Sequence, residues 1–272
     1  MTQKAVPQAG LAPAQISEAF VSACLSEVRA FKPGNVHIYA GGHGMQVADF
    51  EESARVAAPY ISNSKLRTGE RILRAVEATF AAVHCNTNLG ILLLCAPLAV
   101  AAELPQPDGT SLQARLRQVL AQFDATDTAH VFQAIAAASP GGLGDDNKSD
   151  VKRPPPLNIT LLDAMAIASH RDLIAQEYVS GFERIFALHT HEFTPRIAQG
   201  WSALDAIARV YLHALARIPD TRPSAPDAKR ALLGFDAGLK ADGRNPGSLA
   251  DLMAAILFVS ALGQQSDAIV KS

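Results

Sequence analysis

ILLLCAPLAVAA, residues 91–102, is the stretch that decides the fold, because it holds no charged side chain. A second apolar stretch, LMAAILFVSAL, covers residues 252–262. Both are shorter than the roughly 20 residues that a membrane-spanning helix needs. A helix that is apolar on every side is typical of a buried position. We therefore expect two core helices and no membrane span, and we expect Pro97 to kink or end the first of them.

The rest of the chain predicts further helices around these two. Apolar residues recur at helical spacing, aromatic residues make up only 6%, and runs of β-branched residues are scarce. Asp49 with Glu52 forms a capping-box pattern, and Thr68 is a candidate cap. Helices are expected over residues 14–30, 49–60, 68–83, 111–121, 127–138, 160–188 and 200–216, near 226–240, and from Ser248 onward.

Composition limits the class of protein. The 272 residues are 49% hydrophobic and carry a formal net charge of −2, so a generic nucleic-acid binder is not expected. Cys24, Cys85 and Cys95 lack metal-site spacing, and the N-terminus lacks a signal-peptide pattern. We expect reduced thiols in a cytoplasmic protein, with a flexible segment over 1–13 and a single all-α domain over 14–265. A homodimer is left open.

Polar breaks separate the predicted helices. The longest ligand-like one is FKPGNVHIYAGGHGM, residues 31–45, where Lys32 and two histidines lie among glycines. Loops of this kind commonly bind ligands. Cations and amides suit phosphate oxygens, and carboxylates suit Mg²⁺. The other breaks have a similar composition and cover residues 84–90, 139–156, 218–227 and 241–248.

Each break also has an ordinary structural explanation. Asn, Asp and Ser beside Gly or Pro form turns and helix caps in most proteins. The break at 139–156 reads as a surface linker, and Ser248 or Asn245 reads first as a helix cap. The breaks gain functional weight only if they converge at one end of the helical domain, which is the arrangement we expect.

Taken together, these motifs resemble the triphosphoribosyl-dephospho-CoA synthase family. The resemblance rests on five elements that keep the family's order between residues 27 and 253: EVRAFKPGNVH (27–37), GGHGM (41–45), CNTNLG (85–90), PDTR (219–222) and NPGSLADLM (245–253). It implies an all-α transferase that uses Mg²⁺ and ATP. In that family the 2′-hydroxyl of 3′-dephospho-CoA displaces adenine from C1 of the ATP ribose.

The resemblance also implies roles for residues at matching positions. His43, Asp220 and Asp251 would be catalytic, and Glu27, Asp220 and Asp251 would hold Mg²⁺. The residues expected to bind ATP or the second small-molecule substrate are Lys32, Gly34, Asn35, His37, Asn86, Thr87, Asn88, Arg222, Asn245 and Ser248.

Several positions depart from the family pattern. Asn88 and Leu89 stand where the family has His and Lys, His37 replaces an acid, and Arg222 replaces an asparagine. These changes leave three interpretations open: the family reaction, a related transfer to another phosphorylated cofactor precursor, or a nucleotide-binding or scaffold protein without catalysis. A plain helical interaction domain is less consistent with so many polar breaks.

Overall fold

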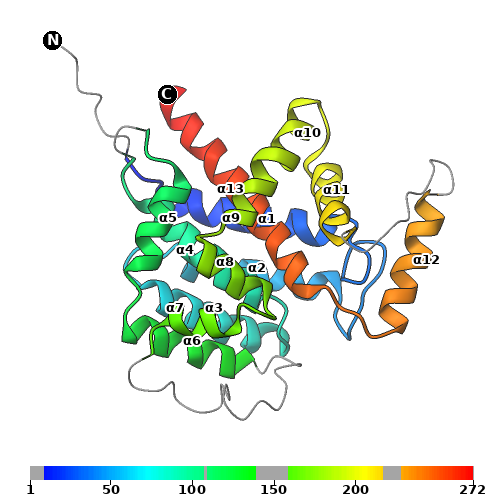
Figure 1. Ribbon diagram of the computed structural model, residues 1–272, viewed down its shortest axis with the longest axis horizontal. Coiled ribbons are helices and arrows are strands. Elements are labelled where there is room, and N and C mark those ends of the chain that lie inside the picture. The colour runs from blue at the N-terminus through cyan, green and yellow to red at the C-terminus, as the bar shows by residue number, and fades with distance from the viewer. Residues whose placement is uncertain (1–8, 107–108, 139–158, 217–227, 272) are drawn as a thin grey trace.

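The protein consists of helices joined by loops over residues 9–106, 109–138, 159–216 and 228–271, the ranges that the computed structural model describes (Figure 1). Within these ranges no strand forms, and the predicted all-α fold is confirmed. The helices are α1 (Pro13–Arg29), α2 (Val47–Ile61), α3 (Thr68–Val83), α4 (Leu89–Glu103), α5 (Leu112–Ala121), α6 (Ala125–Ala138), α7 (Leu161–Ala168), α8 (Leu173–Ser180), α9 (Glu183–Leu188), the π-helical turn η2 (His189–Phe193), α10 (Thr194–Ala198), α11 (Ala203–Leu215), α12 (Ala228–Ala241) and α13 (Gly247–Lys271).

The two apolar helices α4 and α13 lie at the centre of the core. All residues of α4 from Leu89 to Ala99 are buried, and so are the residues of α13 between Leu249 and Val259 apart from Asp251. Helix α1 packs along α13 and also against α2, while α3 packs against α2 and α6. Other helices thus surround the apolar pair, as the sequence predicts.

Pro97 does not end α4, which corrects one part of the expectation. The helix continues to Glu103 with Pro97 inside it. Proline has no N–H, so the carbonyl four residues earlier, at Leu93, loses its helical donor. The buried hydroxyl of Tyr178 on α8 donates to this carbonyl at 2.7 Å. A long-range partner therefore replaces the missing bond and lets the helix continue.

Helix α13 is longer than the apolar run that predicts it. Its Gly247–Ser266 stretch has a mean hydropathy of 1.5 and passes a length and composition test for a membrane span. The stretch is 61% buried inside the protein, and Figure 1 shows α13 crossing the molecule from the α12 side to the C-terminus. Its packing against α1, α4 and α11 accounts for its apolar character.

Two predicted helix caps are wrong. Gln46 precedes α2, and Asp49 is the third helical residue, whose carboxylate accepts the Gln46 N–H at 2.7 Å. Thr68 is the first residue of α3 and does not cap it. The carboxylate of Asp127 on α6 instead accepts the Gly69 N–H at 2.9 Å. A cap supplied by another helix cannot be recognised from local spacing.

The predicted long helix over 160–188 is also wrong. It divides into α7, α8 and α9, with breaks after Ala168 and Ser180. Gly181 and Phe182 both have positive φ, 69° and 62°, which ends α8 before α9 begins. The breaks at 139–156 and 218–227, with Asp220 and Arg222, lie largely or wholly outside the described residues.

Candidate active site

Glu27 and Lys32 form the buried centre of the candidate site. Glu27 lies in the last full turn of α1, and Lys32 follows in the first polar loop. Their side chains are 2% and 1% exposed, and the Lys32 ammonium donates to the Glu27 carboxylate. Burial raises the pKa of Glu27, and the Lys32 charge opposes that shift. The pair positions a cation at the start of the loop without leaving its charge uncompensated.

Asparagine amides join this loop to the start of α13. Asn35 Oδ1 lies 3.4 Å from Lys32 Nζ and accepts the Val36 N–H at 2.9 Å. Asn35 Nδ2 donates to Asn245 Oδ1 at 2.9 Å. The predicted convergence of the first and last polar breaks therefore occurs, through residues 210 positions apart in the chain.

Asp251, in the second turn of α13, adds a third charged group. Its carboxyl has no hydrogen-bond partner among the described residues, although the side chain is only partly exposed. Burial is the main cause that raises its pKa from 3.8 to about 8, and the negative charge of Glu27 adds to the shift. A carboxyl group with these properties keeps its proton at neutral pH and can donate it.

Gly90 leaves the space that the Asp251 carboxyl occupies. Gly90 is the second residue of α4, and a Cβ at this position would lie 2.6 Å from Asp251 Cγ and 2.7 Å from Ile174 Cδ1. A real Cβ does not approach neighbours so closely, so any other residue here would displace the carboxyl. The family resemblance did not single out Gly90 for this role, and its only sequence signal is the glycine that ends CNTNLG.

The remaining predicted residues of the first loop stabilise its shape. Gly34, at φ 84°, donates its N–H to Asp236 Oδ1 at 2.8 Å. His37 is fully buried, and its Nδ1 accepts the Tyr39 N–H at 3.2 Å. Burial, followed by the Lys240 charge, lowers the pKa of His37. The exposed His43 contacts the Gly34 carbonyl through Nε2 at 3.0 Å.

The second polar break has structural hydrogen bonds at the start of α4. Asn86 Oδ1 accepts the Leu89 N–H at 3.1 Å, and the buried Thr87 hydroxyl donates to Ser53 Oγ at 2.6 Å. Asn88 Nδ2 donates to Thr79 Oγ1 at 3.0 Å. These three residues hold the loop against α2 and α3.

The other predicted positions complete the comparison with the sequence. Ser248 lies one turn before Asp251 on α13 and is half-buried. Asp220 and Arg222 fall outside the described residues. Asp236 on α12 was not predicted, because it lies inside a helix and outside every polar break. Asp236 is only 3% exposed, and the sequence contains no pattern that would have indicated this burial.

Few side chains that could bind a metal ion lie together in the part of the chain that is described. No group of three or more His, Cys, Asp or Glu side chains could hold a metal ion there. Cys24 and Cys95 are free and buried beside the charged cluster, and burial is the main cause that raises the pKa of both thiols. Glu27 and Asp251 are the carboxyl groups of this cluster.

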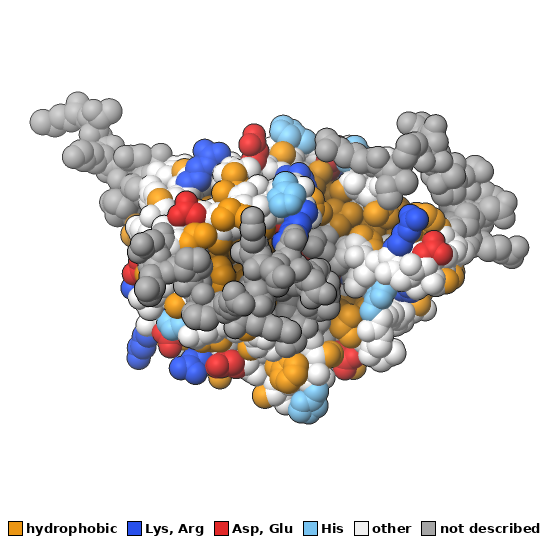
Figure 2. Space-filling view, turned by 60° about the horizontal axis from the view of Figure 1, so that its bottom comes forward, with side chains coloured by type: hydrophobic (Ala, Val, Ile, Leu, Met, Phe, Trp, Pro, Cys, Tyr) orange, Lys and Arg blue, Asp and Glu red, His pale blue; other side chains and the backbone are white. Residues whose placement is uncertain are grey.

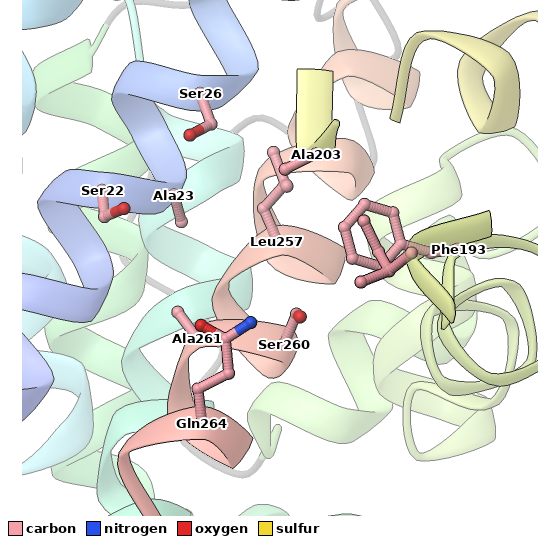
Figure 3. Close-up of a pocket in the computed structure, with 10 residues that line it drawn as sticks. Ser22, Ala23, Ser26, Phe193, Ala203, Leu257, Ser260, Ala261 and Gln264 are labelled. Carbon is pink, nitrogen blue, oxygen red and sulfur yellow. The ribbon is translucent and has the colours of Figure 1, made fainter. Parts of the chain in front are cut away.

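A separate cleft lies between α1, α13, η2 and α11. It has a volume of about 100 Å³ and is open to solvent. Figure 3 shows Ser22 and Ser26 of α1 and Ser260 and Gln264 of α13 on its walls, with Phe193 opposite. None of the residues that line it is charged, so it lacks the cations that a triphosphate requires. The Glu27–Lys32–Asp251 cluster is the better candidate.

One face of the molecule shows how the charged side chains are distributed. On the face in Figure 2, described Lys and Arg side chains alternate with Asp and Glu and form no continuous basic area. Nucleic-acid binding usually requires such an area.

Comparison with known proteins points to one family. The family described as ATP:dephospho-CoA triphosphoribosyl transferase matches residues 13–224 and 222–269. A crystal structure from Archaeoglobus fulgidus, provisionally described as a triphosphoribosyl-dephospho-CoA synthase, aligns with a TM-score of 0.55 and 23% identity over 76% of this chain and 96% of that one. At that identity the likeness concerns the fold. No curated protein matches the chain.

Proposed function

Because this chain belongs to the ATP:dephospho-CoA triphosphoribosyl transferase family, we propose that it transfers the triphosphoribosyl group of ATP to the 2′-hydroxyl of 3′-dephospho-CoA. The hydroxyl oxygen bonds to C1 of the ATP ribose as the bond from C1 to adenine N9 breaks. The hydroxyl loses its proton, and adenine leaves with one. The observation that carries the assignment of the site is Asp251, whose unpartnered carboxyl has a pKa of about 8 beside Glu27 and Lys32.

Asp251 is the proposed proton donor to adenine. Departure of adenine leaves positive charge on the sugar, and a protonated base leaves more easily. At neutral pH the Asp251 carboxyl holds its proton, because its pKa is about 8. After it gives up that proton, the resulting carboxylate would stabilise the developing sugar cation.

Lys32 is the proposed phosphate ligand. Its ammonium already contacts Glu27 and lies 3.4 Å from Asn35 Oδ1, which fixes it near the Asn35–Asn245 bridge. A positioned ammonium can bind a phosphate oxygen of ATP. Two further residues are candidates for contacts with the sugar or the acceptor. His43 lies exposed in the first loop, and Ser248 lies one turn before Asp251 on α13.

The chemistry of the donor set is compatible with Mg²⁺. The ion usually takes one or two carboxylates together with substrate phosphates. Glu27 and Asp251 would supply these oxygens, with Asp220 as a further candidate, and the ion would neutralise the triphosphate. Asp251 can hold a cation only after it loses its proton, so proton donation and metal binding compete for this carboxyl.

A different acceptor is the second candidate function, and the second polar break favours it. Leu89 and Asn88 are neutral, so neither supplies the cation that the family has there. Leu89 is buried at the start of α4, and Asn88 donates to Thr79. Loss of a cation changes which phosphorylated molecule binds well. The acceptor would then be another phosphorylated cofactor precursor.

One assay tests these alternatives. The purified protein is incubated with Mg·ATP, with and without 3′-dephospho-CoA, and adenine and adducts are followed by mass spectrometry. Adenine together with a triphosphoribosyl adduct, only when dephospho-CoA is present, is the expected result. Adenine release that needs a different phosphorylated precursor would support the second candidate. ATP binding without adenine release from any acceptor would contradict catalysis and leave a nucleotide-binding protein.

The pH dependence then tests the role of Asp251. A proton donor loses activity as the pH rises through about 8, whereas a metal ligand gains activity over the same range. Asp251→Asn should lower turnover at least a hundredfold, and the exposed control Asp242→Asn should not. A rate that rises through pH 8 would contradict proton donation by Asp251.

A further inference from the structure

Asp236 on α12 is a buried carboxylate that the proposed chemistry does not use. Its Oδ1 accepts the Gly34 N–H at 2.8 Å, and its Oδ2 accepts from Lys240 Nζ at 3.0 Å. His37 Nε2 lies 3.4 Å from Oδ2, off the direction of a hydrogen bond. A buried carboxylate is costly unless it is paired. Two of these three contacts, those with Gly34 and His37, lie in the loop that carries Lys32.

Helix α12 contacts this loop more than it contacts other helices. It lies apart from the helical core in Figure 1, and among the described elements it packs extensively against no other helix. Lys240 Nζ reaches the Ala40 carbonyl at 3.5 Å. A Cβ at Gly34 would lie 3.1 Å from Leu239 Cδ1 and 2.9 Å from Pro246 Cδ, so loop and helix fit closely. The described contacts of α12 are thus concentrated on the loop.

The contacts flank the residues proposed to bind phosphate. Asp236 holds Gly34 from within α12, and Asn245, just after α12, holds Asn35. Lys32 lies two residues before Gly34 and contacts Asn35. The turn from Lys32 to Asn35 is therefore fixed from both sides by one short segment of chain.

We propose that Asp236 is a positioning residue, which acts through Gly34 to fix the turn that presents Lys32 and Asn35 to the triphosphate. The inference rests on the proposed function for its ligand, but the ordering of the turn can be measured without that ligand. Loss of Asp236 should weaken binding of the triphosphate rather than remove a group that reacts.

Hydrogen exchange of the Gly34 amide in the ligand-free protein tests the ordering. Asp236→Ala removes the acceptor, so this amide should exchange about tenfold faster or more. Asp236→Asn keeps an acceptor oxygen and should restore most of the protection. Asp242→Asn, a charge change at an exposed position after α12, is the control and should leave Gly34 unchanged. Equal exchange in Asp236→Ala and the unmodified protein would overturn the inference.

Steady-state kinetics test the consequence for the substrate. Asp236→Ala should raise KM for Mg·ATP about tenfold while kcat changes less than threefold, with thermal unfolding near that of the unmodified protein. A fall in kcat with unchanged KM, or a KM within twofold of the unmodified value, would overturn the inference. If the unmodified protein transfers nothing, the proposed function fails by itself, and calorimetric binding of inorganic tripolyphosphate replaces KM. Equal affinity in both proteins, or no binding by either, would then overturn the inference.

Discussion

Replacing Asp251 by Asn should stabilise the protein while it removes the proposed proton donor. The amide has nearly the same shape as the carboxyl but carries no ionisable proton. In the folded protein the pKa of Asp251 is about 8, against 3.8 as the ordinary value. At pH 7 the folded protein keeps this carboxyl protonated, whereas the unfolded chain ionises it. About 3 pH units separate pH 7 from the ordinary pKa, and at about 1.4 kcal/mol per unit this difference lowers the free energy of unfolding by about 4 kcal/mol at most. Because the side chain is partly exposed, water reduces this cost, and we expect about 2 kcal/mol.

The sign of the effect fixes its pH dependence. The folded-state pKa lies above the unfolded one, so the unfolded chain loses its proton first as the pH rises from 4. The penalty is absent below about pH 4, grows between 4 and 8, and is constant above 8. The stability difference between Asp251→Asn and the unmodified protein should follow the same course.

Urea unfolding monitored by circular dichroism at several pH values between 4 and 8.5 measures this difference. Asp242→Asn serves as the matched control, because the Asp242 side chain is 65% exposed. Equal free energies of unfolding for Asp251→Asn and the unmodified protein at pH 8, or a difference that does not vary with pH, would refute the reasoning about Asp251.

Three further predictions concern other positions in the described structure. Gly90→Ala should displace the Asp251 carboxyl and lower turnover about a hundredfold while circular dichroism stays helical, and turnover within threefold of normal would contradict the packing argument. Lys32→Ala should lower the free energy of unfolding by about 3 kcal/mol, because it leaves Glu27 buried and unpaired, and the double change with Glu27→Gln should recover stability but not activity in the same assays. Arg71→Lys should lower the free energy of unfolding in urea by about 2 kcal/mol, because the buried Arg71 donates two hydrogen bonds to the Glu103 carboxylate and lysine cannot reproduce both. An unchanged midpoint of urea unfolding would count against that pairing.

Much of the fold could be predicted from local patterns. The apolar stretches predict α4 and α13, and the spacing over 14–30 predicts α1 almost to the residue. Features that depend on distant partners could not be predicted. The Tyr178 hydroxyl replaces the hydrogen bond that Pro97 removes from α4, and nothing in the local sequence of α4 indicates this contact.

The candidate site divides in the same way. Glu27 lies one turn before the first loop, so an orientation toward that loop could be predicted, whereas its pairing with Lys32 depends on the path of the chain after α1. Convergence of the polar breaks was predicted, but the particular bridge from Asn35 to Asn245 joins residues 210 positions apart and could not be. Asp236 lies on a helix with no motif, so only the tertiary structure reveals it. The roles of Asp220 and Arg222 stay predictions from the resemblance.

The two apolar helices both begin at the site, α4 with Gly90 and α13 with Asp251 in the opening turns. Their buried lengths anchor these turns in the core, so the close contact between Gly90 and Asp251 is held by the packed interior rather than by a loop. The loops before these helices are tied to the rest of the protein, because Asn88 donates to Thr79 and Asn35 donates to Asn245. An engineer seeking a new acceptor would therefore vary single positions within residues 84–88 or 241–246 that make no such bond, and keep the framework that holds the Asp251 carboxyl.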